Sequence, residues 1–247
     1  MPRPQGATGN DDIITVLPRG TRLLFKPLCA EEQVIRMRMR KKPNLIPRME
    51  KCAHVQVKQP EELKGKWLGG TEYKNVYLEI GCGKGRFTAE TAKTVPETLY
   101  VAVEKVPDAM VVAMERVCRD ETENVRFIDM DAQKLLEIFE PGEVSRIYIN
   151  FCDPWPSKRH AKRRLTSPLF LDIYKVLLCE GGEIHFKTDN SPLFEYSVET
   201  FEECGWTLSE VTRNLHENGV CGIMTDYEEK FHNQGVNINR CVAVYKK

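Results

Sequence analysis

The residues best suited to chemistry lie in one stretch of the chain, which reads Asp153-Pro154-Trp155-Pro156-Ser157-Lys158-Arg159-His160-Ala161-Lys162-Arg163-Arg164-Leu165. One carboxylate and one aromatic ring stand beside a run of five Lys and Arg side chains. An aspartate before proline favours extended backbone, so the flanking prolines would hold the carboxylate and the ring in a stiff loop. The stretch could hold a base beside a nucleic-acid backbone. A structural proline turn followed by a solvated basic face is the alternative.

The charge balance makes any nucleic-acid contact a local one. The 247 residues carry 36 Lys and Arg against 36 Asp and Glu, a formal net charge of zero, so bulk attraction to RNA or DNA is excluded. The run after Trp155 is one local source of positive charge. A second lies near the N-terminus, at Arg36, Arg38, Arg40, Lys41 and Lys42.

A glycine-rich turn lies upstream, in Glu79-Ile80-Gly81-Cys82-Gly83-Lys84-Gly85. Glycine after a strand permits a tight turn and lets a ligand approach bare backbone. A dinucleotide-binding fingerprint places two residues between its second and third glycines, whereas only Lys84 separates Gly83 from Gly85. The spacing instead resembles the first motif of S-adenosylmethionine-dependent methyltransferases of the Rossmann-like class.

Two further carboxylates follow predicted strands. Glu104 lies about twenty residues beyond the glycines, where such folds accept hydrogen bonds from ribose hydroxyls. Asp131 ends the next strand and could accept from the adenine amino group, or cap the helix that begins at Ala132. These carboxylates, with Glu79 and the glycine turn, predict S-adenosylmethionine as the cofactor.

The elements that would position these residues alternate between strand and helix. This order predicts an α/β fold with a mostly parallel sheet, helices on both faces and a ligand at the carboxyl ends of the strands. The expected strands are Val76–Ile80, Leu99–Val103, Val125–Ile128, Arg146–Phe151, Gly182–Phe186 and Asn239–Tyr245. The expected helices are Arg86–Lys93, Pro107–Arg119, Ala132–Phe139, Ser167–Leu178 and Asp226–His232.

The composition narrows the class of protein further. No apolar run approaches the length of a membrane span and the N-terminus lacks the apolar core of a secretory signal, so we expect a cytoplasmic protein. Nine cysteines without a Cys-x-x-Cys pair, and five scattered histidines, give no reason to expect a metal site. We expect an N-terminal extension over residues 1–36, a basic arm over 37–73 and a catalytic domain over 74–247.

Several of these segments occur together, in order, in one known family. They are Arg38-Met39-Arg40-Lys41-Lys42-Pro43, Glu79 to Gly85, Asp153-Pro154-Trp155-Pro156, Arg159-His160-x-Lys162-Arg163-Arg164, Phe186-Lys187-Thr188-Asp189, and Thr225-Asp226-Tyr227-Glu228-Glu229-Lys230-Phe231. From about Met37 to the C-terminus, the chain closely resembles the bacterial tRNA (guanine-N7)-methyltransferases of the TrmB family. That resemblance implies a Rossmann-like class I methyltransferase that methylates N7 of a guanine in the tRNA variable loop.

The resemblance also implies roles for individual residues. Asp153 would be catalytic and would lie where the cofactor and the guanine meet. Ser157 stands where the family often has a lysine, so either that substrate contact is missing here or Lys158 reaches the same phosphate. The cofactor would contact Glu79, Gly81, Gly83, Glu104, Asp131 and Asp153; the substrate would contact Lys158, Asp189, Thr225, Asp226, Tyr227 and Glu228; and the RNA phosphates would contact Arg159, His160, Lys162, Arg163 and Arg164.

Guanine N7 carries a lone pair and no proton, so its attack on the sulfonium needs no general base. We therefore expect Asp153 to orient the reactants. The runner-up is an amino-group methyltransferase acting on adenine or cytosine, which Trp155 disfavours because it separates Pro154 from Pro156. A non-catalytic RNA-binding module and a nicotinamide dehydrogenase fit less well. We expect tRNA as the partner, no membrane or metal, and either a monomer or a homodimer.

Overall fold

Seven strands form one sheet in the computed structural model, which describes residues 41–246. Their order across the sheet is β3-β2-β1-β4-β5-β7-β6. Neighbours from β3 to β5 run parallel, whereas β7 is antiparallel to β5 and β6. The strands are β1 (Asn75–Ile80), β2 (Thr98–Glu104), β3 (Val125–Asp129), β4 (Val144–Asn150), β5 (Leu178–Thr188), β6 (Trp206–Thr212) and β7 (Asn239–Tyr245).

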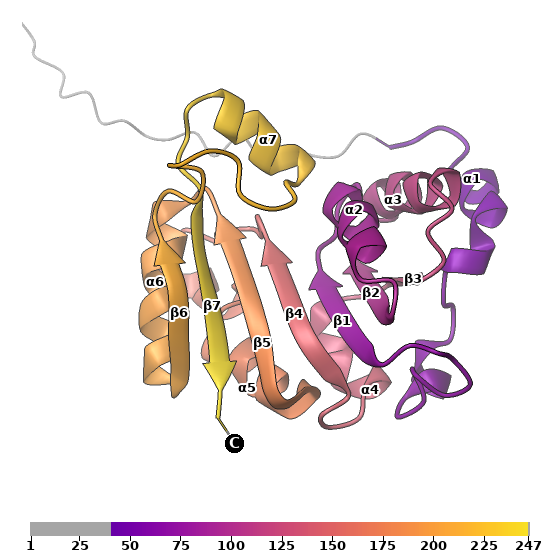
Figure 1. Ribbon diagram of the computed structural model, residues 1–247, viewed down its shortest axis with the longest axis horizontal. Coiled ribbons are helices and arrows are strands. Elements are labelled where there is room, and N and C mark those ends of the chain that lie inside the picture. The colour runs from indigo at the N-terminus through magenta and orange to yellow at the C-terminus, as the bar shows by residue number, and fades with distance from the viewer. Residues whose placement is uncertain (1–40, 247) are drawn as a thin grey trace, which may run out of the picture. The chain divides into compact units, whose positions relative to one another are not determined.

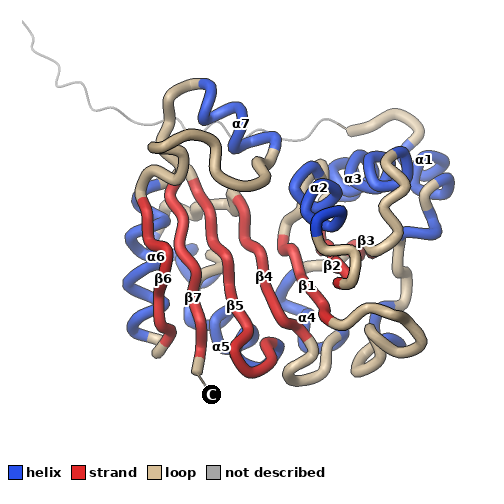
Figure 2. The backbone as a smooth tube through the Cα atoms, viewed as in Figure 1, coloured by secondary structure: helices blue, strands red, loops and turns tan. Residues whose placement is uncertain are grey.

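Helices cover both faces of this sheet, as Figures 1 and 2 show. On one face α2 and α3 pack on β2 and β3, while α4, α5 and α6 lie on the other face. The α-helices are α1 (Leu45–Lys51), α2 (Arg86–Thr94), α3 (Pro107–Arg119), α4 (Leu135–Ile138), α5 (Pro168–Leu177), α6 (Ser191–Glu203) and α7 (Asp226–Asn233). The last of these, α7, lies above the carboxyl ends of β4 and β5 (Figure 1).

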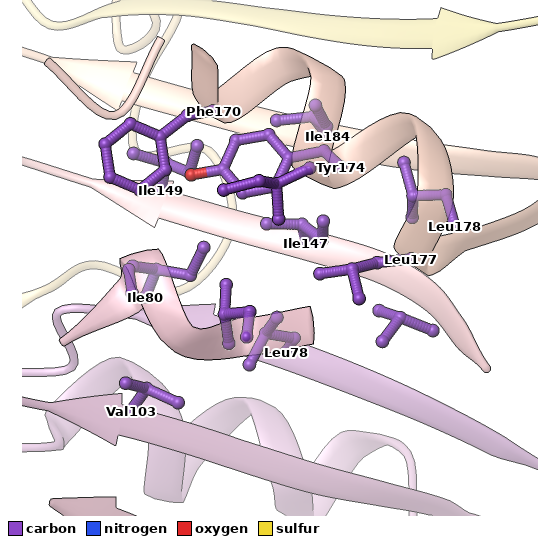
Figure 3. Close-up of a cluster of buried hydrophobic side chains, with 14 of the residues drawn as sticks. Leu78, Ile80, Val103, Ile147, Ile149, Phe170, Tyr174, Leu177, Leu178 and Ile184 are labelled. Atoms are coloured by element: carbon purple, nitrogen blue, oxygen red, sulfur yellow. The ribbon is translucent and has the colours of Figure 1, made fainter. Parts of the chain in front are cut away.

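The larger core cluster lies between the sheet and α5. Alternate residues of each strand point toward it, including Leu78 and Ile80 from β1 and Ile147 and Ile149 from β4 (Figure 3). Tyr174 of α5 fills the space above them and is fully buried. Burying an apolar side chain such as Ile147 contributes on the order of 1.5–3 kcal/mol relative to leaving it exposed. This packing fixes the strand ends, and with them the loops that carry the site.

The residues before β1 pack onto the domain. Trp67 is buried, and its indole nitrogen donates to the carbonyl of Ile138 at 2.8 Å. In α1, the Arg48 guanidinium pairs with Glu115 of α3 at 2.6 Å. The described part of the expected basic arm is thus attached to the fold, and its boundary at residue 74 stays a prediction. Arg36, Arg38, Arg40 and the expected 1–36 extension lie outside the described residues.

The mostly parallel α/β fold is confirmed, with corrections to individual elements. The β4 strand stops at Asn150, because Phe151 turns to a φ of 53°. The expected helix over 132–139 is a 3-10 turn, Ala132–Lys134, followed by the short α4. The β5 strand begins at Leu178, which was expected to end a helix. Three elements were not predicted from the sequence: α1, α6 and β6.

Two further findings concern residues 41–246 as a whole. No helix among them is long and apolar enough to cross a membrane. Within the same range, no group of three or more His, Cys, Asp and Glu side chains is arranged to hold a metal ion.

Candidate functional site

The glycine turn lies at the point where the strand order reverses, between β1 and its neighbours β2 and β4. Gly81 and Gly83 adopt φ of 79° and 56°, and a Cβ on either would have no heavy atom within 4 Å. Gly85 differs, because a Cβ there would lie 2.4 Å from the Cβ of Ala113 in α3. The first two glycines therefore leave open space where a ligand can approach the backbone, and the third allows close helix packing.

Glu104, the last residue of β2, braces this turn. One carboxylate oxygen accepts from the backbone N–H of Gly83 and the other from that of Val106, both at 2.9 Å. Burial raises the pKa of Glu104, and these backbone donors oppose the rise because they favour the ionised form. The carboxylate thus lies beside the glycine turn, as a ribose-binding acid requires. Its contact with the ribose stays a prediction.

Glu79 lies beneath the turn and is only 2% exposed. Its carboxylate accepts from the Thr88 hydroxyl at 2.6 Å, from the Tyr100 hydroxyl at 3.3 Å and from the Asn150 amide at 3.3 Å. Burial raises the pKa of Glu79, and the three donors act against that rise. These bonds tie β1 to α2, β2 and β4. Glu79 therefore has a positioning role, and its predicted contact with the cofactor stays a prediction.

Asp131 follows β3 and is exposed. Its side chain accepts from the backbone N–H of Gln133 at 3.0 Å and so caps the turn Ala132–Lys134. The predicted capping role is confirmed. The second predicted role, accepting from the adenine amino group, stays open because the cap uses one carboxylate oxygen and leaves the other free to accept.

The loop that carries Asp153 follows β4, beside the glycine turn. Phe151 and Trp155 have φ of 53° and 42°, values that are uncommon for aromatic residues and cluster at functional sites. Arg164 holds the loop from below, because its guanidinium donates to the carbonyls of Pro154 and Trp155, each at 3.1 Å. The same guanidinium lies 4.1 Å from the Tyr196 ring centroid. Asp153 itself is exposed at the tip.

The basic run forms a 3-10 helix, Lys158–Arg163. Lys158, Arg159, Lys162 and Arg163 are exposed, and none forms an ion pair with another described residue. Arg163 stacks its guanidinium 4.2 Å from the Trp155 ring centroid, and His160 meets the same ring edge-on at 5.9 Å. Four unpaired cations thus surround the loop. Arg164 is the exception, because its Nε and one of its Nη atoms donate to the loop carbonyls.

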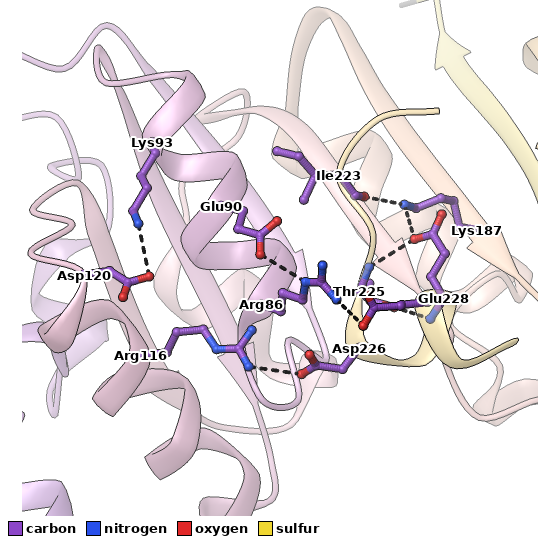
Figure 4. A network of polar contacts seen from close by, with 11 residues as sticks. Arg86, Glu90, Lys93, Arg116, Asp120, Lys187, Ile223, Thr225, Asp226 and Glu228 are labelled. Carbon is purple, nitrogen blue, oxygen red and sulfur yellow. Dashed lines mark hydrogen bonds and ion pairs between the residues drawn. The ribbon is translucent and has the colours of Figure 1, made fainter. Parts of the chain in front are cut away.

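The predicted substrate residues at the start of α7 are mostly engaged in internal contacts. Thr225 and Glu228 form a reciprocal capping box, and Glu228 is fully buried. Asp226 pairs with Arg116 of α3 at 3.4 Å (Figure 4). Tyr227 is 43% exposed. Asp189, after β5, is half-buried and burial raises its pKa. The predicted substrate contacts of these residues stay predictions.

Two hollows lie at opposite ends of the strands. One, of about 720 Å³, lies at the amino ends of β2 and β3 and is lined by residues such as Lys93, Glu123 and Arg126. The other, of about 340 Å³, lies beside the loop that precedes α7 and is lined by residues that include Asn150, Lys187 and Ile223. Only the second lies near the carboxyl ends, where ligands bind in such folds. Two of its buried polar atoms, Asn150 Oδ1 and Thr91 Oγ1, have no partner among the described residues.

Comparison with known proteins shows which family the chain belongs to. A sequence profile described as "Putative methyltransferase" matches residues 73–241. A protein of Listeria monocytogenes serotype 4b (strain F2365), named tRNA (guanine-N(7)-)-methyltransferase, is 45% identical over 213 residues, which cover 85% of this chain and all of that protein. The chain belongs to the tRNA (guanine-N7)-methyltransferase family.

Solved structures bear on the fold of this methyltransferase. The 16S rRNA methyltransferase KamB superposes with a TM-score of 0.57 at 17% identity, covering 76% of this chain and 92% of that one. An antibiotic-related methyltransferase gives a TM-score of 0.52 at 16% identity, covering 70% and 87%. At these identities the likeness shows the Rossmann-like class I fold alone.

S-adenosylmethionine fits the glycine turn of this methyltransferase. The open space before Gly81 and Gly83 admits a ligand to bare backbone, and the Glu104 carboxylate lies directly beside it.

Sequence reasoning missed several residues that shape the site. Each of the missed residues forms its hydrogen bond or ion pair with a residue elsewhere in the sequence. They are Lys187, Asn150, His216, Arg86 and Arg116. Lys187 stood inside the segment Phe186 to Asp189, which carries part of the family resemblance, but its contact with Glu228 could not be read from the sequence.

Proposed function

We propose that the protein transfers the methyl group of S-adenosylmethionine to N7 of a guanine in the variable loop of tRNA. The observation that carries the proposal is the match over the full length of a relative named for this reaction. The arrangement of the site supports it, because the glycine turn and the Asp153 loop follow the adjacent strands β1 and β4.

The reaction needs little from the protein beyond placement. S-adenosylmethionine, when bound, supplies an electrophilic methyl group on a sulfonium. Gly81 and Gly83 would offer bare backbone to it, Glu104 would accept from the ribose hydroxyls and Asp131 from the adenine amino group. Because guanine N7 carries no proton, Asp153 would accept from the N–H donors of the base and hold it in line. Such alignment can supply about 7–11 kcal/mol of barrier reduction.

The basic surface around Asp153 suits an RNA backbone. Lys158, Arg159, Lys162 and Arg163 are free to neutralise phosphates, while Lys158 would also serve in place of the family's lysine at Ser157. The target guanine must leave its stack, at a cost on the order of a few kcal/mol. The Trp155 ring, which contacts Arg163 and His160, would receive the base in our proposal.

We further propose that the enzyme works in the cytoplasm, needs no metal and acts as a monomer or homodimer. Incubation of unmodified tRNA with isotope-labelled S-adenosylmethionine, followed by mass spectrometry of the nucleosides, tests the reaction. We expect labelled 7-methylguanosine. Label in N6-methyladenosine or in a methylated cytosine amino group would instead support the runner-up, and no transfer with no cofactor binding would favour a non-catalytic RNA-binding module.

A further inference from the structure

A buried carboxylate, that of Glu228, organises the polar contacts beneath α7. It is 0% exposed and accepts from Lys187 Nζ at 2.7 Å and from His216 Nε2 at 3.1 Å. Lys187 and His216 are themselves only 7% exposed. Lys187 comes from the end of β5 and His216 from the loop after β6. One carboxylate thus joins three segments that are distant in the sequence.

Lys187 and His216 also form hydrogen bonds to the loop before α7. Lys187 donates a second hydrogen bond, to the carbonyl of Ile223 at 3.2 Å. His216 accepts at Nδ1 from the backbone N–H of Cys221 at 3.1 Å, which assigns its proton to Nε2, where it donates to Glu228. The His216 ring also packs edge-on against His232 of α7, at 4.8 Å between centroids.

The helix that this carboxylate anchors contacts both halves of the site. Glu229 of α7 pairs at 2.8 Å with Arg86, the residue that begins α2 directly after the glycine turn. Phe231 of α7 stacks on Phe151, two residues before Asp153, at 6.4 Å between ring centroids. Figure 4 shows Asp226 and Glu228, at the start of α7, between Arg116 on one side and Lys187 on the other. The position of α7 is therefore linked to the cofactor side and to the acceptor side together.

We propose that Lys187 and His216 are positioning residues for methyl transfer: they orient the Glu228 carboxylate and thereby hold Thr225 to Tyr227 and α7 across the carboxyl ends of the strands. The inference rests on the proposed function and deepens it. Neither residue is required to touch the reactants. Their effect passes through Glu228, which is costly to leave buried without a positive partner.

The physical consequence of losing Lys187 follows from that cost. An uncompensated carboxylate would move toward water and draw the start of α7 with it. Glu104 and the glycine turn are braced separately, by backbone donors in Gly83 and Val106. The change should therefore reduce turnover of tRNA and leave cofactor affinity nearly intact. A displacement of about 1 Å can lower a rate by about 100-fold.

The test compares Lys187→Met with Lys74→Met. Lys74 forms an equally short pair with Glu97, at 2.6 Å, but both side chains are exposed, so its loss should change turnover by no more than about threefold. We expect Lys187→Met to lower kcat/KM for tRNA by about 100-fold while the Kd for S-adenosylhomocysteine, measured by calorimetry, stays within about threefold. Equal kcat/KM values in the two variants would overturn the proposal.

A second pair of variants covers the case in which Lys187→Met fails to fold. His216→Gln can still donate to Glu228 and accept from Cys221, whereas His216→Ala can do neither. We expect the alanine variant to lose turnover and the glutamine variant to recover most of it, with cofactor affinity unchanged in both. Equal turnover in the two, or parallel loss of cofactor affinity, would refute a positioning role. Wild-type enzyme that makes no 7-methylguanosine would refute the proposed function instead.

Discussion

The glycine turn offers a sharp test, because Gly83 and Gly85 differ in what surrounds them. Both have positive φ, at 56° and 71°, so alanine at either costs about 1–2 kcal/mol in backbone strain. At Gly85 the new Cβ would also lie 2.4 Å from the Cβ of Ala113, and overpacking of this kind adds about 1–3 kcal/mol. At Gly83 the new methyl would enter open space, where we place the cofactor.

The two substitutions should therefore separate stability from binding. For a domain of this size about 1 kcal/mol lowers the melting temperature by about 2–4 °C, so we expect a loss of about 10 °C for Gly85→Ala and about 5 °C for Gly83→Ala. S-adenosylhomocysteine at about 100 times its Kd should stabilise wild type by about 2.7 kcal/mol. That gain should persist in Gly85→Ala and disappear in Gly83→Ala.

Thermal unfolding with and without S-adenosylhomocysteine, together with calorimetric titration, measures both quantities. Wild-type affinity in Gly83→Ala would show that the ligand does not approach the backbone at this glycine. Equal losses of stability in the two variants would show that the contact between Gly85 and Ala113 does not limit helix packing. Either result would refute this account of the turn.

Three further predictions concern turnover, salt and acid. Asp153→Ala should lower turnover strongly with tRNA and cofactor saturating, because the base loses its orienting acceptor; near wild-type turnover would contradict that role. Arg163→Ala should reduce the slope of log affinity for tRNA against log salt concentration by about 0.7–0.9, which corresponds to the loss of one phosphate contact. Arg164→Ala should leave this slope unchanged and lower turnover, because Arg164 holds the Asp153 loop. Equal slopes in the two variants would place the RNA elsewhere, and the basic arm that includes Lys41 would be the next candidate. Burial lowers the pKa of His216. The unfolded chain therefore takes up a proton at about pH 6.5, whereas the folded protein resists protonation at that pH. The stability that is present above this pH is lost as the pH falls below it. The melting temperature of wild type should accordingly drop more between about pH 7.5 and pH 5.5 than that of His216→Gln, and parallel curves would argue against this origin.

Much of the fold could be predicted because most strands are buried and leave a strong local pattern. The bounds of α3 and β7 are those expected, since each element carries a group of buried apolar residues that gives a clear local pattern. The β6 strand was missed because it lies at the sheet edge with most of its residues exposed, which leaves no run of apolar side chains. Helix α6 depends on a cap by Asn190 that a single sequence signals only weakly.

The site was predictable where its residues follow strands, and less so where they act through distant partners. The glycines, Glu104 and the Asp153 loop could be placed from their order alone, because parallel strands bring their carboxyl ends together. Arg164 resembled its neighbours in sequence, yet it points inward to the loop carbonyls. Glu228 lies within a recognisable segment, but Lys187 and His216 are 41 and 12 residues away, and only folding brings them together.

The central claim is that the lone pair of a guanine N7 accepts the methyl group, and one atomic substitution tests it directly. A tRNA carrying 7-deazaguanosine at the target position of the variable loop retains the amino group and the pairing edge but lacks the N7 lone pair. We predict that labelled S-adenosylmethionine transfers its methyl group to the unsubstituted tRNA and leaves that position of the substituted tRNA unlabelled. Equal transfer to both would contradict the account and point to an amino group as the acceptor.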